Sequence, residues 1–359
     1  MSMTPDANPI RLPVRSNAST RAVWCALLAT ALAGALSAAA PAPAEPTADR
    51  GKTAGSAADY RGGLVLVEGK SGKGSAFIAE MKGRKYLVTN AHVLAGIRDA
   101  HFKPLDNTVL KLGPGMIAVG HDIVMLTVLD GGTGIPAAES VPADAAIDDA
   151  VLVPGNAGGQ SVVNMVKGVI VGIGPDRIEV SAPIEPGSSG SPIIHVGSGK
   201  VIGIATYLME LSDRRSKEKK VRRFGYRLDS VKQWQRIEWG QFYTEADRAE
   251  KMHKSTVEFF EAVSDAVEDV VAGFRRSAQS YESPAIRQAM ERFYVTARQN
   301  PGDAEQAMKN LFAGLRTASA NDLRAAKSAF SYDYFKRQVD DEERARHALT
   351  SNPKIYMRN

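Results

Sequence analysis

The sequence predicts a mainly β domain followed by an α-helical domain. At 359 residues the chain exceeds one compact domain, so two folded units are expected. From about residue 60 to 243, short runs rich in Val and Ile recur between glycines. After Tyr243, apolar residues recur every three or four positions instead, which is typical of amphipathic helices.

The β region contains many short predicted strands separated by Gly and Pro turns. This pattern favours a sandwich or a barrel, and the absence of a fixed period argues against a propeller or solenoid. We also expect a strand over Phe224–Leu228. The other predicted strands are Gly63–Glu68, Ser75–Ala79, Tyr86–Thr89, Ile123–Val128, Val162–Gly172, Ile178–Val180, Pro192–Val196 and Val201–Tyr207.

The helical region is predicted to begin with Thr244 as N-cap and to occupy residues 244–359. Ser283-Pro284 and Asn300-Pro301 interrupt the apolar pattern, and they predict further helices at about 284–299, 303–316 and 320–348. We expect the apolar stripes of these helices to pack on one another or on the β domain.

The N-terminus has the pattern of an export signal. Arg11, Arg15 and Arg21 precede an uncharged stretch over residues 22–40, and small residues follow to Ala44. We therefore expect a signal peptide over 1–44, a linker over 45–59 and the β domain over 60–243. The chain would then be exported, to a bacterial periplasm or outside the cell. A retained membrane anchor is the alternative, because an uncharged stretch of this length can span a bilayer.

Charge and cysteine content exclude several kinds of site. A net charge of +5, from 45 basic and 40 acidic residues, is too small to imply nucleic acid as a partner. The single cysteine, Cys25, lies in the predicted signal, so neither a disulfide framework nor a thiolate zinc site is expected. We expect no metal and no cofactor.

Three segments of the β region carry residues suited to catalysis. His92 follows a predicted strand, Asp122 opens another, and Ser189 lies in the glycine-flanked segment Gly187–Pro192. Each alone is an ordinary feature of a strand end or a loop. Acyl transfer, however, needs a nucleophile, a base that takes its proton and an acid that orients the base. The order His, Asp, Ser within one all-β domain is therefore specific. A Ser-centred α/β-hydrolase elbow does not fit this order, because that fold places Ser before Asp and His.

Residues 60–240 resemble the trypsin-like serine peptidases of the HtrA/DegP type. The segments that carry the resemblance are Thr89-Asn90-Ala91-His92-Val93, Asp122-Ile123-Val124-Met125-Leu126 and Ala182-Pro183-Ile184-Glu185-Pro186-Gly187-Ser188-Ser189-Gly190-Ser191-Pro192. The resemblance implies the double β-barrel of the chymotrypsin fold and an endopeptidase that acts on protein or peptide substrates.

The same resemblance assigns roles to individual residues. Ser189 would be the nucleophile, His92 the general base and Asp122 the acid that orients it. The backbone N–H groups of Gly187 and Ser189 would form the oxyanion hole. The specificity pocket would lie along Ala182, Pro183, Ile204, Ala205 and Thr206. No acidic residue occurs among these five, so we expect a small or medium aliphatic side chain before the scissile bond rather than Arg or Lys.

Departures from the family pattern limit what the resemblance implies. Ser188 and Ser191 replace the usual Asn and Gly. Ser188 also stands where zymogen-activated trypsins carry Asp, so activation by cleavage is not expected. We interpret His121 as a surface residue beside Asp122 and His195 as a packing residue. The helical C-terminus has no PDZ-like pattern, so PDZ-gated regulation is not expected.

Residues 214–223 form a basic segment with seven positive charges and one acid. By family likeness this loop borders the substrate cleft. It would attract acidic substrates or dock the enzyme on an anionic envelope surface, and the alternative is a solvated hairpin tip. The competing function for the whole chain is a catalytically inactive trypsin-like scaffold whose helical domain recruits a partner. The sequence leaves the natural substrate and the oligomeric state open.

Overall fold

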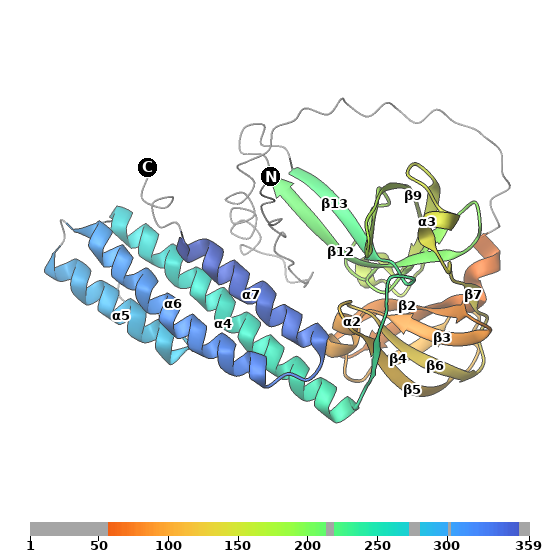
Figure 1. The fold of residues 1–359 in the computed structure, drawn as a ribbon, viewed down its shortest axis with the longest axis horizontal. Helices are drawn as coiled ribbons and strands as arrows, with labels where there is room; N and C mark the ends of the chain where they lie inside the picture. The colour runs from red at the N-terminus through yellow and green to blue at the C-terminus, as the bar shows by residue number, and fades with distance from the viewer. Residues whose placement is uncertain (1–56, 213–218, 273–280, 301–302, 352–359) are drawn as a thin grey trace, which may run out of the picture. The chain divides into compact units, whose positions relative to one another are not determined.

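The computed structural model describes residues 57–212, 219–272, 281–300 and 303–351. The predicted signal peptide, most of the predicted linker and positions 214–218 of the basic segment lie outside the described residues. The chain forms two compact units that divide between Trp239 and Gly240 (Figure 1). The first is built mainly of strands and the second of helices, which confirms the predicted fold class.

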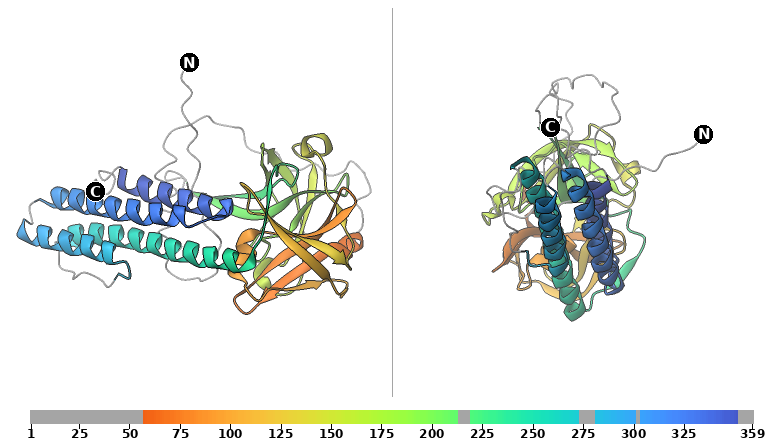
Figure 2. Two further views of the ribbon diagram at one scale, coloured as in Figure 1. Left: turned by 60° about the horizontal axis from the view of Figure 1, so that its bottom comes forward. Right: turned by 90° about the vertical axis from the view of Figure 1, so that its left-hand side faces the viewer.

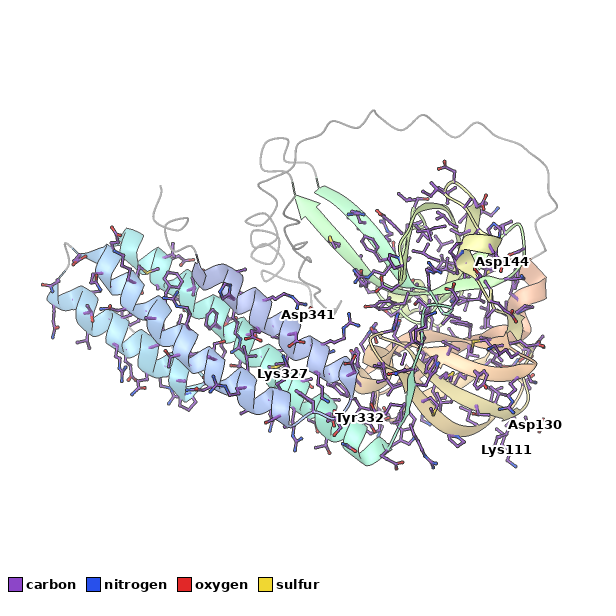
Figure 3. All side chains as sticks on the ribbon, in the orientation of Figure 1. Lys111, Asp130, Asp144, Lys327, Tyr332 and Asp341 are labelled. Atoms are coloured by element: carbon purple, nitrogen blue, oxygen red, sulfur yellow. The ribbon has the colours of Figure 1, made fainter. Side chains whose placement is uncertain are left out.

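The β unit begins with an eight-stranded sheet. Its strands follow the order β14-β5-β6-β3-β2-β1-β4, and β7 pairs in parallel with β2. Lys111 and Asp130 are cross-strand partners in β5 and β6 (Figure 3). The strands are β1 (Leu64–Gly69), β2 (Gly72–Met81), β3 (Arg84–Thr89), β4 (His101–Pro104), β5 (Lys111–Ala118), β6 (Val124–Asp130), β7 (Ile135–Pro136) and β14 (Trp234–Arg236).

The remaining six strands form a closed barrel in the order β10-β13-β12-β11-β8-β9. These are β8 (Ala150–Gly155), β9 (Asn164–Ile173), β10 (Arg177–Val180), β11 (Pro192–His195), β12 (Val201–Ser212) and β13 (Lys219–Tyr226). In the described part of the β unit, the short helix η1 (Ala57–Gly63) precedes β1, and the short helices α2 (Ala91–Gly96), α3 (Val141–Asp144) and η2 (Ala157–Gly159) connect strands. The fold is thus the chymotrypsin-like arrangement that the resemblance predicted.

Two hydrophobic clusters stabilise the β unit. One contains Phe77 and Val88 from the sheet together with Ile204 and Tyr226 from the barrel, so it joins the two halves. The other fills the barrel with small and β-branched residues such as Ile170. Burial of these side chains supplies the main driving force for folding the unit. It also fixes the strand ends near which His92 and Asp122 lie.

Four helices form the second unit: α4 (Trp239–Ala272), α5 (Pro284–Gln299), α6 (Ala304–Ser328) and α7 (Asp333–Ser351). The helices lie alongside one another in both views of Figure 2. The prediction that Thr244 is the N-cap is wrong, because α4 begins at Trp239 and the Thr244 hydroxyl donates within the helix to the Gly240 carbonyl. No helix of the described residues is long and apolar enough to cross a bilayer.

The break predicted between 316 and 320 is also wrong, because α6 continues through it to Ser328. Ser319 in this stretch is buried, and its hydroxyl accepts a hydrogen bond from Arg346 of α7. Arg346 is itself buried and also donates to Thr256 and to the Met252 carbonyl of α4. A polar link inside the bundle therefore ties this stretch of α6 to α7 and α4.

Candidate active site

The candidate acid and base lie at neighbouring strand ends of the sheet. His92 is the second residue of α2, which follows β3 directly, and Asp122 lies in the turn that leads into β6. β3 and β6 are hydrogen-bonded neighbours, with Thr89 opposite Val124. The sheet therefore brings residues 92 and 122, far apart in the sequence, to one edge.

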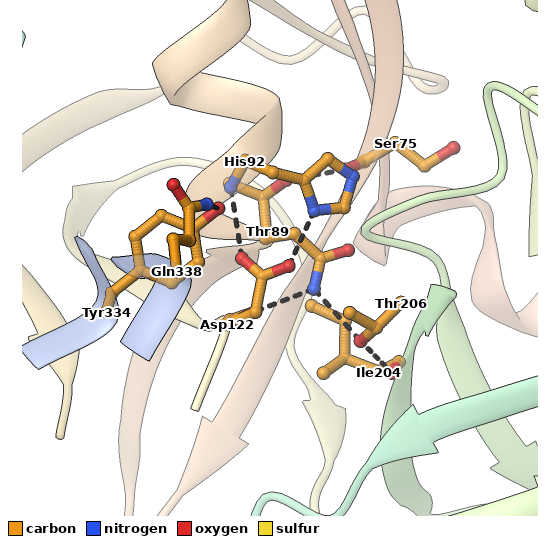
Figure 4. Close-up of polar contacts among 9 residues, drawn as sticks. Ser75, Thr89, His92, Asp122, Ile204, Thr206, Tyr334 and Gln338 are labelled. Atoms are coloured by element: carbon orange, nitrogen blue, oxygen red, sulfur yellow. Dashed lines mark hydrogen bonds and ion pairs between the residues drawn. The ribbon is translucent and has the colours of Figure 1, made fainter. Parts of the chain in front are cut away.

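Asp122 contacts His92 through both carboxylate oxygens (Figure 4). The His92 backbone N–H donates to Oδ1 at 3.0 Å, and the ring Nδ1 lies 2.6 Å from Oδ2. Both side chains are largely buried, with exposures of 25% for His92 and 14% for Asp122. A carboxylate can only accept, so Nδ1 carries the proton and Nε2 is left as a base.

Asn90 connects the Asp122–His92 pair to the rest of the β unit. Its side-chain N–H donates to the Asp122 carbonyl at 2.7 Å and to the Thr206 hydroxyl at 3.1 Å (Figure 4). Asn90 and Thr206 are both buried, and they belong to the sheet and to the barrel, respectively. Asn90 therefore links the acid to the second half of the unit. The sequence analysis quoted Asn90 within a motif but gave it no role.

The segment that carries Ser189 joins β10 to β11 and begins with a tight turn. Its Ser188 N–H donates to the Glu185 carbonyl at 2.9 Å, and Gly187 has φ of +93°. Proline at the second position and a positive φ at the third are the signature of a type II turn. A Cβ on Gly187 would lie 2.2 Å from the Asn156 carbonyl oxygen, so only glycine fits here.

Hydrogen bonds along this segment follow an alternating pattern. The N–H groups of Ser188 and Gly190 donate to the carbonyls of Glu185 and Ala205. Within the described part of the chain, the N–H groups of Gly187 and Ser189 donate to no protein acceptor. These are the two groups that the resemblance assigns to the oxyanion hole, and both are available to an oxygen placed between them.

Ser189 is half-buried, and it forms no hydrogen bond with His92 among the described residues. A Cβ built on Gly74 would lie 2.8 Å from Val93 of α2 and 3.6 Å from the Ser189 carbonyl oxygen. Only a narrow space therefore separates α2 from the backbone of the segment that carries Ser189. Catalytic hydrogen bonds in free enzymes are commonly long and tighten when substrate binds. The structure thus joins His92 to Asp122 and places Ser189 nearby.

The two serines that depart from the family pattern are both buried. Ser188 is the last residue of the turn, and its N–H donates the hydrogen bond that closes the turn onto the Glu185 carbonyl. Ser191 is fully buried, and its hydroxyl finds no partner among the described residues. A Cβ on Gly155 would lie 2.0 Å from that hydroxyl, so the serine occupies space which a glycine on β8 leaves open.

The residues predicted to line the specificity pocket differ in exposure. Ala182, Ile204 and Ala205 are completely buried in the hydrophobic clusters, whereas Pro183 is exposed. Thr206 is buried, and it donates to the Ile204 carbonyl while it accepts from Asn90. The three alanine and isoleucine side chains are therefore part of the core, and the pocket itself stays a prediction.

Two further histidines of the unit, His121 and His195, have local partners. The prediction of His121 as a surface residue is wrong: it is half-buried, its ring packs edge-on against Tyr226, and its two nitrogens lie 3.1 Å from the Val119 carbonyl and 3.0 Å from the Ser230 hydroxyl. His195 is buried at the end of β11, where it contacts Ser198 and Asp149.

The described end of the basic segment is partly neutralised. Arg222 forms a two-pronged ion pair with Glu179 and lies over the Phe224 ring. The hydrogen bonds to Glu179 raise the pKa of Arg222. Its charge is therefore engaged within the fold, and any attraction of acidic partners would rest on the other basic residues. Among the described residues, no group of three or more His, Cys, Asp or Glu is placed to bind a metal ion.

Comparisons with known proteins identify the β unit. Residues 74–204 match the family model of the trypsin-like peptidase domain. An uncharacterized protein of Sinorhizobium fredii, y4bJ, is 32% identical over 147 residues, which are 38% of this chain and 22% of that protein. The match therefore spans about a fifth of the relative's length.

Similar solved structures include an HtrA-type protease, AlgW, with a tripeptide, at 24% identity and a TM-score of 0.36, covering 48% of this chain and 58% of that one. A serine endoprotease from Yersinia pestis is 24% identical, with a TM-score of 0.33 over 45% of this chain and 58% of that chain. An inactive serine-to-alanine mutant of Rv3671c from M. tuberculosis H37Rv is 19% identical, with a TM-score of 0.36 over 48% and 84%. The segment 74–204 of this chain is thus similar to the trypsin-like peptidase domain that its family model describes.

Proposed function

We propose that the chain is a serine endopeptidase that cleaves protein or peptide substrates through an acyl-enzyme. The Ser189 hydroxyl attacks the scissile carbonyl while His92 Nε2 takes its proton. The tetrahedral oxyanion is stabilised by the N–H groups of Gly187 and Ser189. When the C–N bond breaks, the proton on Nε2 passes to the leaving amine.

Deacylation repeats these steps with water as the nucleophile. His92 takes a proton from the water as it attacks the acyl carbonyl, and that proton returns to the Ser189 oxygen when the ester bond breaks. Asp122 remains ionised throughout and stabilises the imidazolium that forms twice in each cycle.

The observation that carries the proposal is the two-point contact between Asp122 and His92. A histidine fixed through its backbone N–H and its Nδ1 cannot rotate away, and its Nε2 is presented as a base. A histidine with a purely structural role would not need this two-point contact with Asp122. Nor would it need a glycine-flanked serine in a segment where the Gly187 and Ser189 N–H groups donate to no described acceptor. The trypsin-like family model supports the same assignment.

A fluorophosphonate probe tests the proposal directly, because it reacts with serines activated by a base. We expect labelling of the parent chain on Ser189 and none with Ser189→Ala or His92→Ala, both with unchanged unfolding midpoints. The double variant should hydrolyse peptide scarcely more slowly than either single one, because triad members act as a unit. A folded parent chain that neither labels nor cleaves would support the inactive scaffold instead.

We also propose that the chain is exported, on the basis of the N-terminal pattern. Expression in a bacterium followed by mass measurement of the exported chain would test this. A mature chain that begins near residue 45 supports cleavage. An intact N-terminus in the membrane fraction supports the anchor, and an intact chain in the cytoplasm excludes both.

A further inference from the structure

The oxyanion hole depends on the orientation of four successive peptide groups around the nucleophile. The carbonyls of Pro186, Gly187, Ser188 and Ser189 each accept a hydrogen bond. A peptide whose carbonyl is fixed on one side must direct its N–H to the other side, because the peptide group is planar and trans. The contacts of the Pro186 and Ser188 carbonyls therefore direct the Gly187 and Ser189 N–H groups, and those of the Gly187 and Ser189 carbonyls direct the N–H groups of the two peptides that follow them.

Ser75 of β2 supplies two of these four contacts. Its backbone N–H donates to the Ser189 carbonyl and its hydroxyl donates to the Gly187 carbonyl, each at 2.9 Å. One residue therefore holds the peptide before Ser188 and the peptide after Ser189. Ser75 is only 3% exposed, so water does not compete for these bonds.

The Ser75 hydroxyl is itself oriented by the loop that follows β8. The Asn156 N–H donates to Ser75 Oγ at 2.9 Å, and a serine hydroxyl has one hydrogen to give. That hydrogen is consequently directed to the Gly187 carbonyl. Two residues further along the same loop, the Gly158 N–H donates to the Pro186 carbonyl at 2.8 Å. The loop thus acts on the turn directly and, through Ser75, indirectly.

The Ser75 hydroxyl differs from the other contacts in one respect. Among the described residues, the carbonyls of Pro186, Ser188 and Ser189 are held by backbone N–H groups, which side-chain substitutions do not remove. The Gly187 carbonyl is held by a side chain. This carbonyl follows the one residue of the turn with a left-handed φ, where a glycine backbone has the most freedom to rotate.

We infer that Ser75 is a positioning residue for catalysis, whose hydroxyl fixes the peptide between Gly187 and Ser188. This peptide joins the two peptides that carry the oxyanion-hole N–H groups, so its orientation sets how those groups converge on the transition state. The inference rests on the proposed peptidase function and adds a residue to it. From the sequence alone, Ser75 is predicted only to be the first residue of a strand. Its role follows from bonds that connect β2, the loop after β8 and the segment around Ser189.

Ser75→Ala in the full chain tests the inference, with Thr89→Val as the matched control. Thr89 is also fully buried, and its hydroxyl donates to the Ser75 carbonyl at 2.8 Å without touching the Gly187 turn. Each substitution removes one buried hydroxyl, and each should lower stability to a similar extent, by about 1 kcal/mol. A merely structural role for Ser75 would make the two variants alike in activity.

We expect kcat on a peptide amide to fall about 10- to 100-fold in Ser75→Ala, somewhat less than the loss of one oxyanion donor causes elsewhere, while KM is unchanged. Affinity for a peptidyl trifluoromethyl ketone, whose adduct places an oxyanion in the hole, should fall by the same factor. Thr89→Val should keep both values of the parent.

Several outcomes would overturn the inference. These are equal kcat values for Ser75→Ala and Thr89→Val, or a rise in KM with unchanged kcat. If Ser75→Ala lacks a cooperative unfolding transition, Ser75→Cys replaces it, because a thiol is a weak donor of similar shape; kcat must then lie below that of the parent. A parent chain that fails to label with the fluorophosphonate would refute the peptidase proposal itself, which distinguishes the two failures.

Discussion

A Cβ on Gly190 would lie 1.9 Å from the carbonyl oxygen of Ser75. The residue after the nucleophile therefore lies against the backbone of β2, and its φ of +90° is one that side chains rarely adopt. Close approach and backbone conformation both require glycine at this position.

We predict that Gly190→Ala lowers the free energy of unfolding by more than about 2 kcal/mol and abolishes probe labelling, because the clash is with backbone that cannot move freely. Urea denaturation measures the first effect. Gly83→Ala is the control: it has a similar φ of +72°, but nothing lies within 4 Å of the added Cβ. Equal losses for the two variants would show that φ, and not the contact with Ser75, dominates.

Replacing Asp122 by Asn should reduce kcat steeply, by about 10⁴-fold if the effect matches that in a related triad. The amide keeps an acceptor for the His92 N–H but offers a donor to Nδ1, which favours the tautomer with its proton on Nε2. Steady-state kinetics on a peptide amide would measure the loss. Asp130→Asn, at an exposed carboxylate that accepts only from Gly131, should retain the parent rate. Parent-like turnover in Asp122→Asn would remove the aspartate from the mechanism.

Ser191→Ala should stabilise the protein. The buried hydroxyl forms no hydrogen bond with the described residues, and an unsatisfied buried polar group costs about 1–3 kcal/mol. We expect a gain of about 1 kcal/mol, which corresponds to an increase in Tm of about 2–4 °C in a protein of this size range. Thermal unfolding followed by circular dichroism is sufficient. A lower Tm would mean that the hydroxyl has a partner in solution.

The Arg227–Asp229 pair should make stability fall in acid. Burial alone would raise the pKa of Asp229, but hydrogen bonds from Arg227 and from the Val141 N–H outweigh it, and the pKa is lowered. A carboxylate with a lowered pKa in the folded state contributes stability above its unfolded value, about 3.9, and loses it as pH falls through the folded value.

Asp229→Asn should therefore cost about 3 kcal/mol near neutral pH, since it leaves the buried Arg227 partly unpaired, and the difference from the parent should shrink below about pH 4. Urea unfolding at several pH values measures this. Glu238→Gln breaks an exposed pair with Arg236 and should cost almost nothing at any pH. A difference that grows in acid would contradict the assigned direction.

A chain shortened after Gly240 should remain folded and label with the probe, because the β unit has its own two hydrophobic clusters. It keeps Ile237, whose N–H donates to the Gly115 carbonyl of β5. A chain shortened after Ser230 loses β14 and uncovers an edge of β5, so we expect it to aggregate. Light scattering and labelling distinguish the two. Insolubility of the longer one would show that the helices complete the β unit.

The sequence was sufficient to predict His92 and Asp122, but only part of the fold that holds them in place. All eight Val- and Ile-rich runs form strands, because alternating burial on a sheet selects such residues. β5 was missed because Gly113, Pro114 and Gly115 resemble a loop; the strand exists through pairing with β6, with irregular register at these residues. No local pattern could indicate this.

The same limit applies to the active site. His92 and Asp122 were found through motifs, and the structure places them in contact. Ser75 and Gly158 act through backbone partners that the sequence cannot pair, since any residue has a carbonyl and most have an N–H. Similarly, the continuation of α6 through Ser319 could not be predicted, because the partner of this serine, Arg346, lies on another helix.

The position of β14 also affects when the proposed active site can be completed during synthesis of the chain. Trp234 pairs with Ala118 at the far end of β5, and the turn that carries Asp122 joins β5 to β6. As the chain emerges from the ribosome, this turn lies in an incomplete sheet until the last strand of the β unit has been made. We expect the acid of the triad to reach its final position only then, so that a nascent chain carries a serine and a histidine but no finished peptidase.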